Sequence, residues 1–132
     1  MPAALPAPRI VLNLAGAGLR TFFNVGVKWG LSNTDQMKLL GLTSRSTFFK
    51  WRKQQPHSVP RDTLERISYV LGIYKALHVL LPGEGAADSW LRRPNAAPLF
   101  GGKPALERML RGNVGDLYAV RQYLDAMRGG WA

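Results

Sequence analysis

Few residues of this sequence are of the types that carry acid–base, nucleophilic or metal chemistry. It contains two histidines, His57 and His78, and no cysteine, which removes disulfides, thiolate metal sites and cysteine nucleophiles together. No cluster of histidine, aspartate and glutamate has the spacing of metal ligands. The Gly16-Ala17-Gly18 segment follows no predicted strand, so it does not indicate a nucleotide-binding loop. We therefore predict a protein that is not an enzyme and that needs no cofactor or metal.

Lysine and arginine are the residues whose number and placement indicate a chemistry. The formal net charge is +10; residues 1–83 hold 11 basic side chains against 3 acidic ones, whereas residues 84–132 hold 7 against 5. From Gln36 to Arg61 there are six bases and no acid. Such a one-sided field suits a polyanion such as nucleic acid. A solvated basic surface that aids solubility is the alternative explanation of the charge.

The elements that must position these bases are helical almost throughout, because apolar residues recur every three or four positions. The first predicted helix covers about 12–29. Its predicted inward stripe consists of Leu19, Phe22, Phe23 and Val27. A short helix follows, with Asn33 or Thr34 as its N-cap and a stop at Gly41. After a tight turn, Ser44 or the residue before it caps another short helix that runs to about Gln54.

A long helix comes next, from about Pro60 to the break at Pro82-Gly83-Glu84-Gly85. Its predicted buried stripe is Leu64, Ile67, Leu71, Tyr74 and Leu81, widened by Val70 and Leu77. Beyond the break we expect helices near 88–91, 104–111 and 116–128. The last of them has Leu117, Val120, Leu124 and Met127 on one face. The sequence thus predicts an all-α protein without strands.

Two short helices joined by a tight turn, the second basic on its outer face, have the plan of a helix-turn-helix. The second helix of such a unit lies in the major groove of DNA, where base edges are distinguishable. On a helical wheel, Phe48, Trp51 and Gln55 cluster on one side, with the first two as core residues. The predicted DNA contacts are Arg45, Ser46, Lys50, Arg52 and Lys53. The alternative is that they form only the solvent face of a surface helix.

Phe49 is the exception on the basic face, because the wheel points this apolar ring outward. Three explanations are open. The ring contacts a thymine methyl group in DNA, or it packs against a partner chain, or the helix register differs by one residue and buries it.

The start of the chain bears on the domain limits and on the compartment. Three prolines in the first eight residues predict an extended or disordered arm over residues 1–11, followed by the helix-turn-helix domain over 12–82. The longest apolar stretch, Ile10 to Leu19, is interrupted by Asn13 and is about half the ~20 residues that a bilayer requires. With no secretory signal pattern and no cysteine, we expect the protein in the cytoplasm.

Short motifs in the second half resemble a known family. They are Trp90-Leu91-Arg92-Arg93-Pro94-Asn95, Phe100-Gly101-Gly102-Lys103-Pro104 and Ala119-Val120-Arg121-Gln122-Tyr123-Leu124. In order and spacing they are similar to the toxin-binding domain of the Xre/MbcA/ParS antitoxins. In the first half, residues 67–77 look like the long central helix of that family and residues 44–53 like its recognition helix. The resemblance covers roughly residues 20–132, with one departure, since the turn from Gly41 to Ser44 is a residue longer than the family's usual Gly-apolar-Ser.

The resemblance implies an antitoxin of a type II toxin–antitoxin system whose partner is a RES-domain toxin that consumes NAD. It implies that the N-terminal domain binds the operon's promoter, while the C-terminal domain, here 83–132, covers the toxin and its chain end blocks the active site. We expect a homodimer within a hetero-oligomeric complex. The predicted toxin-binding residues are Arg121, Arg128, Gly129, Gly130, Trp131 and Ala132. Tryptophan is a favoured interface anchor and paired glycines let a chain turn sharply; a frayed tail with an exposed tryptophan is the alternative.

Two other functions remain open from the sequence. A stand-alone transcriptional regulator would use its C-terminal helices only to dimerise or to sense a ligand. An interaction module that has lost DNA binding would fit the longer turn before Ser44. A neighbouring gene that encodes a RES-like toxin would favour the antitoxin over the stand-alone regulator.

Overall fold

The computed structural model describes the backbone of residues 6–129 and the side chains of residues 16–129. Within that range the chain forms helices and no strands, and an isolated bridge joins Pro94 to Pro104. The predicted all-α fold is therefore confirmed. The helices are α1 (Pro6–Lys28), α2 (Asn33–Leu40), α3 (Arg45–Lys53), α4 (Arg61–Leu80), α5 (Ala86–Trp90), α6 (Ala105–Met109) and α7 (Val114–Gly129).

The first helix begins earlier than its sequence indicated. We predicted a start near Leu12 after an arm over residues 1–11, but α1 begins at Pro6, so the arm is wrong from that residue onward. Residues 1–5 lie outside the described part of the chain. Proline is compatible with a first turn because the first four N–H groups of a helix have no intrahelical acceptor. The two prolines at positions 6 and 8 therefore fall where α1 tolerates them.

The inward face of α1 consists of Leu19, Phe22, Val25 and Trp29, all of which are buried. Val27, which we placed in this stripe, is instead 78% exposed. At 100° per residue it lies roughly 150° around the helix from the centre of the buried set. The prediction failed because the sequence does not say which of two apolar arcs meets the rest of the protein.

Both short helices begin at serines that act as N-caps. The Ser32 hydroxyl accepts a hydrogen bond from the backbone N–H of Asp35 at 3.0 Å, so the cap of α2 is one residue earlier than the predicted Asn33 or Thr34. The Ser44 hydroxyl accepts from the N–H of Thr47 at 3.2 Å, so Ser44 is the cap of α3 of the two residues that the sequence allowed. In both helices a side chain satisfies a donor that the first turn leaves without a partner.

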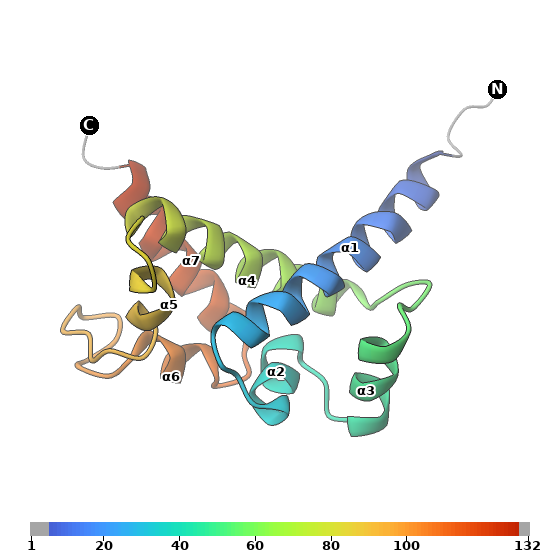
Figure 1. The fold of residues 1–132 in the computed structure, drawn as a ribbon, viewed down its shortest axis with the longest axis horizontal. Helices are drawn as coiled ribbons and strands as arrows, with labels where there is room; N and C mark the ends of the chain where they lie inside the picture. The colour runs from blue at the N-terminus through green and yellow to red at the C-terminus, as the bar shows by residue number, and fades with distance from the viewer. Residues whose placement is uncertain (1–5, 130–132) are drawn as a thin grey trace.

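The long helix α4 is the central element of the molecule, with α1 packed against one part of it and α7 against another (Figure 1). Its buried apolar residues are Ile67, Val70, Ile73, Ala76 and Leu77. The predicted stripe was centred wrongly, because Leu64, Leu71, Tyr74 and Leu81 are only half-buried. Two neighbouring helices set the buried face of α4, and a one-helix periodicity argument cannot locate them.

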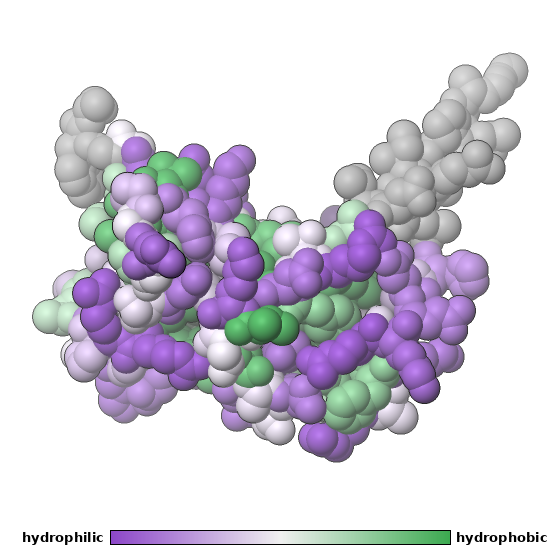
Figure 2. Space-filling model, viewed as in Figure 1, coloured by the Kyte–Doolittle hydropathy of each residue, from purple (hydrophilic) through white to green (hydrophobic). Residues whose placement is uncertain are grey.

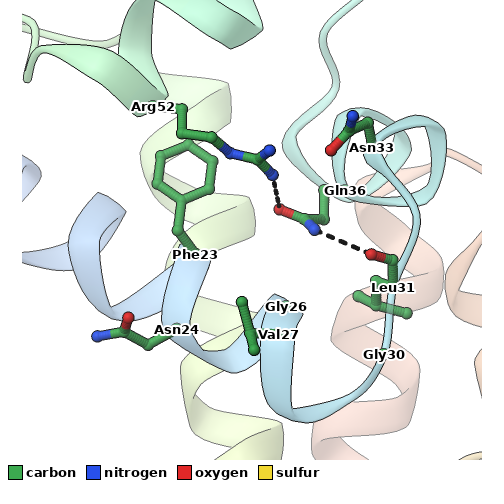
Figure 3. Close-up of a pocket in the computed structure, with 9 residues that line it drawn as sticks. All are labelled: Phe23, Asn24, Gly26, Val27, Gly30, Leu31, Asn33, Gln36 and Arg52. Carbon is green, nitrogen blue, oxygen red and sulfur yellow. Dashed lines mark hydrogen bonds between the residues drawn. The ribbon is translucent and has the colours of Figure 1, made fainter.

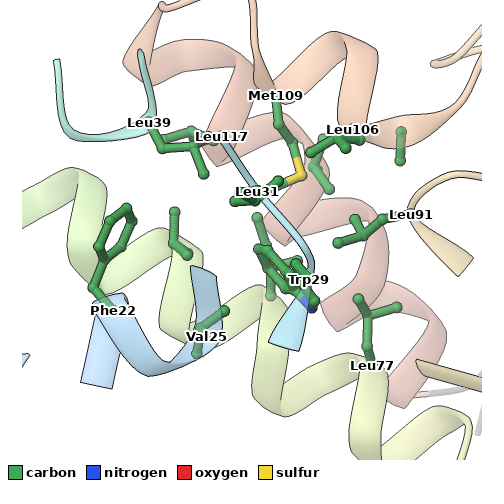
Figure 4. Packing of buried hydrophobic residues seen from close by; sticks show 14 of the residues in the cluster. Phe22, Val25, Trp29, Leu31, Leu39, Leu77, Leu91, Leu106, Met109 and Leu117 are labelled. Carbon is green, nitrogen blue, oxygen red and sulfur yellow. The ribbon is translucent and has the colours of Figure 1, made fainter. Parts of the chain in front are cut away.

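One hydrophobic core runs through both halves of the chain. Trp29 and Leu31, at the end of α1 and just after it, pack in the same cluster as Leu77 of α4 and Leu117 of α7 (Figure 4). Pro82–Gly85 ends α4, yet the core is continuous across it. In α7, Leu117, Val120 and Leu124 are buried as predicted, whereas Met127 is 50% exposed, because it lies beyond Leu124, the last buried residue of that helix.

The Pro-Asn and Gly-Gly turns of residues 94–104 lie against each other in space. The N–H of Asn95 donates to the carbonyl of Lys103 at 3.3 Å, and the N–H of Gly102 donates to the carbonyl of Asn95 at 2.8 Å. Gly101 and Gly102 have φ values of 60° and 88°, a region that glycine adopts without strain. The two turns thus form one structural unit that leads into α6.

Candidate nucleic-acid interface and partner surface

Helices α2 and α3 form the predicted helix-turn-helix. Gly41 ends α2 with a φ of 73°, and a Cβ at that position would lie 2.7 Å from Nε of Arg66. Glycine is therefore required there both by its conformation and by the close approach of Arg66. Phe48 anchors α3, since it is completely buried and its ring packs edge-on against Phe23 with 5.8 Å between centroids. Trp51, predicted as core, is half-buried at the edge of the cluster.

Four of the five predicted DNA contacts share the outer face of α3. Arg45, Ser46, Lys50 and Lys53 are all exposed, and within the described residues no ion pair involves a base of α3. Figure 2 shows that hydrophilic side chains dominate this end of the molecule, with a hydrophobic patch between them. The positive charge of this face is not neutralised within the fold and is available to an anionic partner.

Arg52, the fifth predicted contact, has a different place. Its guanidinium donates a hydrogen bond to Oε1 of Gln36 at 3.0 Å and lies 4.8 Å from the ring centroid of Phe48 and 5.5 Å from that of Phe23. Gln36 is only 3% exposed, and its Nε2 donates to the carbonyl of Leu31 at 3.1 Å (Figure 3). Arg52 is exposed like the other four residues, but its guanidinium is held at the edge of that face by Gln36 and the two phenylalanine rings.

Sequence reasoning missed Gln36 and Gly26, which line the same surface pocket as Arg52. A Cβ at position 26 would lie 2.8 Å from Cδ of Gln36, so the amide fits only because α1 has a glycine there (Figure 3). In the sequence alone, this glycine indicates only a weakness of the first helix. A buried glutamine opposite a glycine indicates that two helices pack closely. The pair can be recognised only when α1 and α2 are known to be in contact.

The register of α3 settles one alternative for Phe49, because its side chain is 40% exposed and so is not buried by a shifted helix. The ring lies edge-on to Phe48 with 5.3 Å between centroids, and Cζ of Arg45 lies 5.4 Å from the ring centroid. Phe49 is therefore held in place on the outer face.

The predicted toxin-binding residues begin with Arg121 on α7, whose role inside the fold is now visible. Its Nε donates to Oδ2 of Asp125 at 2.9 Å, and its guanidinium lies so close to Gly72 of α4 that a Cβ there would come within 1.8 Å of Nη1. Arg121 thus crosses α4 where that helix has no side chain. Arg128 and Gly129 are exposed in the last turn of α7, and Gly130, Trp131 and Ala132 lie outside the described residues.

An aromatic pair on the α4–α7 surface was not predicted. Tyr69 and Tyr118 contact each other edge-on with 5.6 Å between ring centroids, and Tyr118 is 45% exposed. Burial together with the hydrogen bond that Tyr69 donates to Glu65 raises the pKa of the Tyr69 hydroxyl. Tyrosines of this kind are common in protein interfaces because one end is apolar and the other polar.

Arg92, from the Trp-Leu-Arg-Arg motif, ties the second half of the chain to the end of α1. Its Nη2 donates to the carbonyl of Trp29 at 2.7 Å and to that of Gly30 at 3.1 Å. The motif therefore contributes to the fold as well as to whatever surface it presents.

Two other kinds of site are absent from the described residues. No helix there is both long and apolar enough to cross a membrane. No group of three or more histidine, aspartate or glutamate side chains there is arranged to hold a metal ion.

The fold and these sites define a helix-turn-helix protein whose second half is a small helical binding unit. Residues 8–72 match the family described as the antitoxin Xre-like helix-turn-helix domain, and residues 76–130 match the antitoxin Xre/MbcA/ParS C-terminal toxin-binding domain. The chain is also 54% identical over 114 residues, 86% of each chain, to "Uncharacterized protein y4oB" of Sinorhizobium fredii (strain NBRC 101917 / NGR234). The chain belongs to the Xre/MbcA/ParS antitoxins.

Proposed function

We propose that this antitoxin neutralises a RES-domain, NAD-consuming toxin and represses its own operon by binding the promoter through the outer face of α3. The toxin class is what the family resemblance of the three motifs within residues 90–124 implies. Membership of the antitoxin family supports a toxin partner for the C-terminal half. Both partners imply a cytoplasmic protein. The role is that of a non-enzymatic regulator, which acts by occupying the surfaces of its partners.

The observation that carries the DNA-binding half of the proposal is the outer face of α3. Its basic side chains, Arg45, Lys50 and Lys53, are exposed, and no acid of the described residues pairs with them. A helix cap at Ser44 and a buried Phe48 hold the helix so that this face points outward. Lysine and arginine that replace the counterions of phosphates supply much of the affinity of such proteins for DNA.

We further propose that the antitoxin acts as a homodimer within a larger complex with the toxin. Dimeric helix-turn-helix proteins place two recognition helices one helical turn of DNA apart, about 34 Å, so operators carry two half-sites. A single copy presents one α3 and would read only one half-site. The antitoxin should therefore protect two half-sites of the promoter, separated by about one or two helical turns.

The experiment that tests the proposal is co-expression of the antitoxin with the product of the adjacent gene. Size-exclusion chromatography with light scattering should show one complex that contains both chains, and the isolated toxin should consume NAD while the complex does not. A fluorescently labelled fragment of the operon's promoter should bind the antitoxin with an affinity that falls steeply with salt. Promoter binding without any toxin partner would instead favour the alternative, a stand-alone transcriptional regulator.

A further inference from the structure

Phe49 is the large apolar side chain at the centre of an otherwise polar and basic helix face. Arg45, Phe49 and Lys53 are spaced by four residues, so they follow one line along α3. Phe49 is 40% exposed, while Phe48 beside it is fully buried. A single exposed apolar residue is ordinary on a protein surface. What distinguishes Phe49 is its position in the middle of the face that the proposed function assigns to DNA.

The neighbours of Phe49 hold its ring on the outer face and restrict its movement. On one side it meets the edge of the buried Phe48, with 5.3 Å between centroids and an interplanar angle of 74°. The guanidinium of Arg45, one turn earlier, lies over it at 5.4 Å, a cation–π distance. A side chain whose orientation is fixed before binding loses little conformational entropy when a ligand covers it.

The chemistry around Phe49 limits what can cover it. A second copy of the chain carries the same excess of positive charge, +10 in all, and would bring like charges together over this face. The major groove of DNA, in contrast, combines negative phosphates with one exposed apolar group, the C5-methyl of thymine. Of these two occupants, DNA is therefore the one that satisfies the bases and the ring together.

We propose that Phe49 is a specificity-determining residue that reads thymine by packing its ring against the C5-methyl group in the operator. The inference rests on the proposed DNA-binding function and adds to it a base preference. Arg45, stacked on the ring, is pre-positioned beside the same base pair and contributes charge without selecting that base.

The test removes methyl groups from the DNA one at a time. Thymines of the promoter fragment are replaced singly by deoxyuridine, which lacks only the C5-methyl, and binding is measured by fluorescence anisotropy at fixed salt. For the wild-type protein we expect one or two replacements per half-site to weaken binding about three- to fivefold, the effect of removing one packed methyl group. The Phe49→Ala variant should bind the thymine and deoxyuridine fragments equally, with the salt slope of the wild type.

The controls separate specificity from folding. Val79→Ala, which shortens another exposed apolar side chain away from α3, should keep the sensitivity to deoxyuridine. Phe49→Leu should keep part of it, and both Phe49 variants should remain folded at the temperature of the binding assay, because the fully buried Phe48 still anchors α3. Promoter binding that ignores every deoxyuridine replacement, or a Phe49→Ala variant that still discriminates, would overturn the inference and leave DNA binding intact. No promoter binding by the wild type would overturn the proposed function itself.

Discussion

The basic residues of α3 have different roles because their side chains make different contacts. Lys50, Arg52 and Lys53 are all exposed, but only the guanidinium of Arg52 packs against two phenylalanine rings and the amide of Gln36. The planar guanidinium suits that environment, since it stacks on rings and donates in a fixed direction. Lysine's compact, strongly hydrated ammonium suits contact with phosphates. Removing one of these lysines should therefore have a different effect on the protein from removing Arg52.

Removing Lys50 and Lys53 together should weaken promoter binding and lower its dependence on salt. The slope of log affinity against log salt should fall by about one unit for each phosphate that the protein no longer neutralises, so by about two for Lys50→Ala with Lys53→Ala. Affinity is measured by anisotropy across a salt series. Lys75→Ala, which removes an exposed lysine from α4, serves as the control and should leave the slope unchanged. An unaltered slope in the double variant would show that these lysines do not touch the DNA backbone.

Gln36→Leu should weaken promoter binding by changing the position of α3, and not by changing the charge of the face proposed to contact DNA. The substitution leaves the Arg52 guanidinium and the Leu31 carbonyl without the amide that bridges them, which should lower the free energy of unfolding by about 1–3 kcal/mol. Promoter affinity should also fall at temperatures where the protein is fully folded, but with the wild-type salt slope. Thermal melting and the same salt series measure both. Gln54→Leu, at an exposed residue, should change neither quantity; a lowered salt slope in Gln36→Leu would refute the positioning role.

Gly41, at the end of α2, sets the direction in which the chain leaves that helix toward α3. Gly41→Ala should destabilise the protein by about 2–3 kcal/mol, because a Cβ is strained at a φ of 73° and would also meet Arg66. Arg66 would lose its place beside Asp62, to which its Nε donates at 2.8 Å. Gly115→Ala in α7 is the matched control, since nothing lies within 4 Å of the new methyl group. The control should be neutral or more stable by up to about 1 kcal/mol; equal melting of the two variants would contradict this role of Gly41.

Local signals in the sequence predicted the helices and their ends well. They did not predict how one helix packs against another. The Ser44 cap, the stop at Gly41 and the buried Phe48 all depend on neighbours within a turn or two, and all were predicted. The exposure of Val27 and Met127 depends on where other helices pack, and both were placed wrongly. For the same reason the contacts of the Arg52 guanidinium could not be predicted, because its partners Gln36 and Phe23 are distant in sequence.

At the scale of the whole molecule, the two proposed binding surfaces lie at separate ends of one core. Helix α3 lies at one end of the molecule and the end of α7 at the other (Figure 1). The continuous core and the bond from Arg92 to the end of α1 join the two halves. A toxin bound near the end of α7 would therefore leave α3 accessible, so we expect the toxin–antitoxin complex to bind the promoter as well as the antitoxin alone does. Gel-shift assays with both species at equal antitoxin concentration measure this.

The C-terminal segment, which starts at the last residue of α7, Gly129, should contribute inhibition more than assembly. Deleting residues 129–132 should release NAD consumption while the complex stays largely assembled, because two separable jobs are involved. Leu106, Val120 and Leu124 are buried and hold α6 and α7 together, and with them the surface proposed to contact the toxin. The deleted segment is short, and blocking a substrate's path needs position more than affinity. Gly129 ends α7 and Gly130 follows it, so glycine stands where the chain would have to turn into a cleft, and Trp131 is large enough to fill an apolar slot there.

The assay compares NAD consumption by co-purified complexes of full-length and truncated antitoxin at equal occupancy, which light scattering establishes. Trp131→Ala isolates the aromatic ring from the rest of the segment, and Met127→Ala, at an exposed residue of the last turns of α7, is the control. Full inhibition by the truncated chain would mean that the folded helices themselves cover the active site. Loss of the complex would mean that Trp131 is a main anchor, and then inhibition and assembly depend on the same residue. Release of activity from an intact complex is the one result that assigns the two jobs to different parts of the chain.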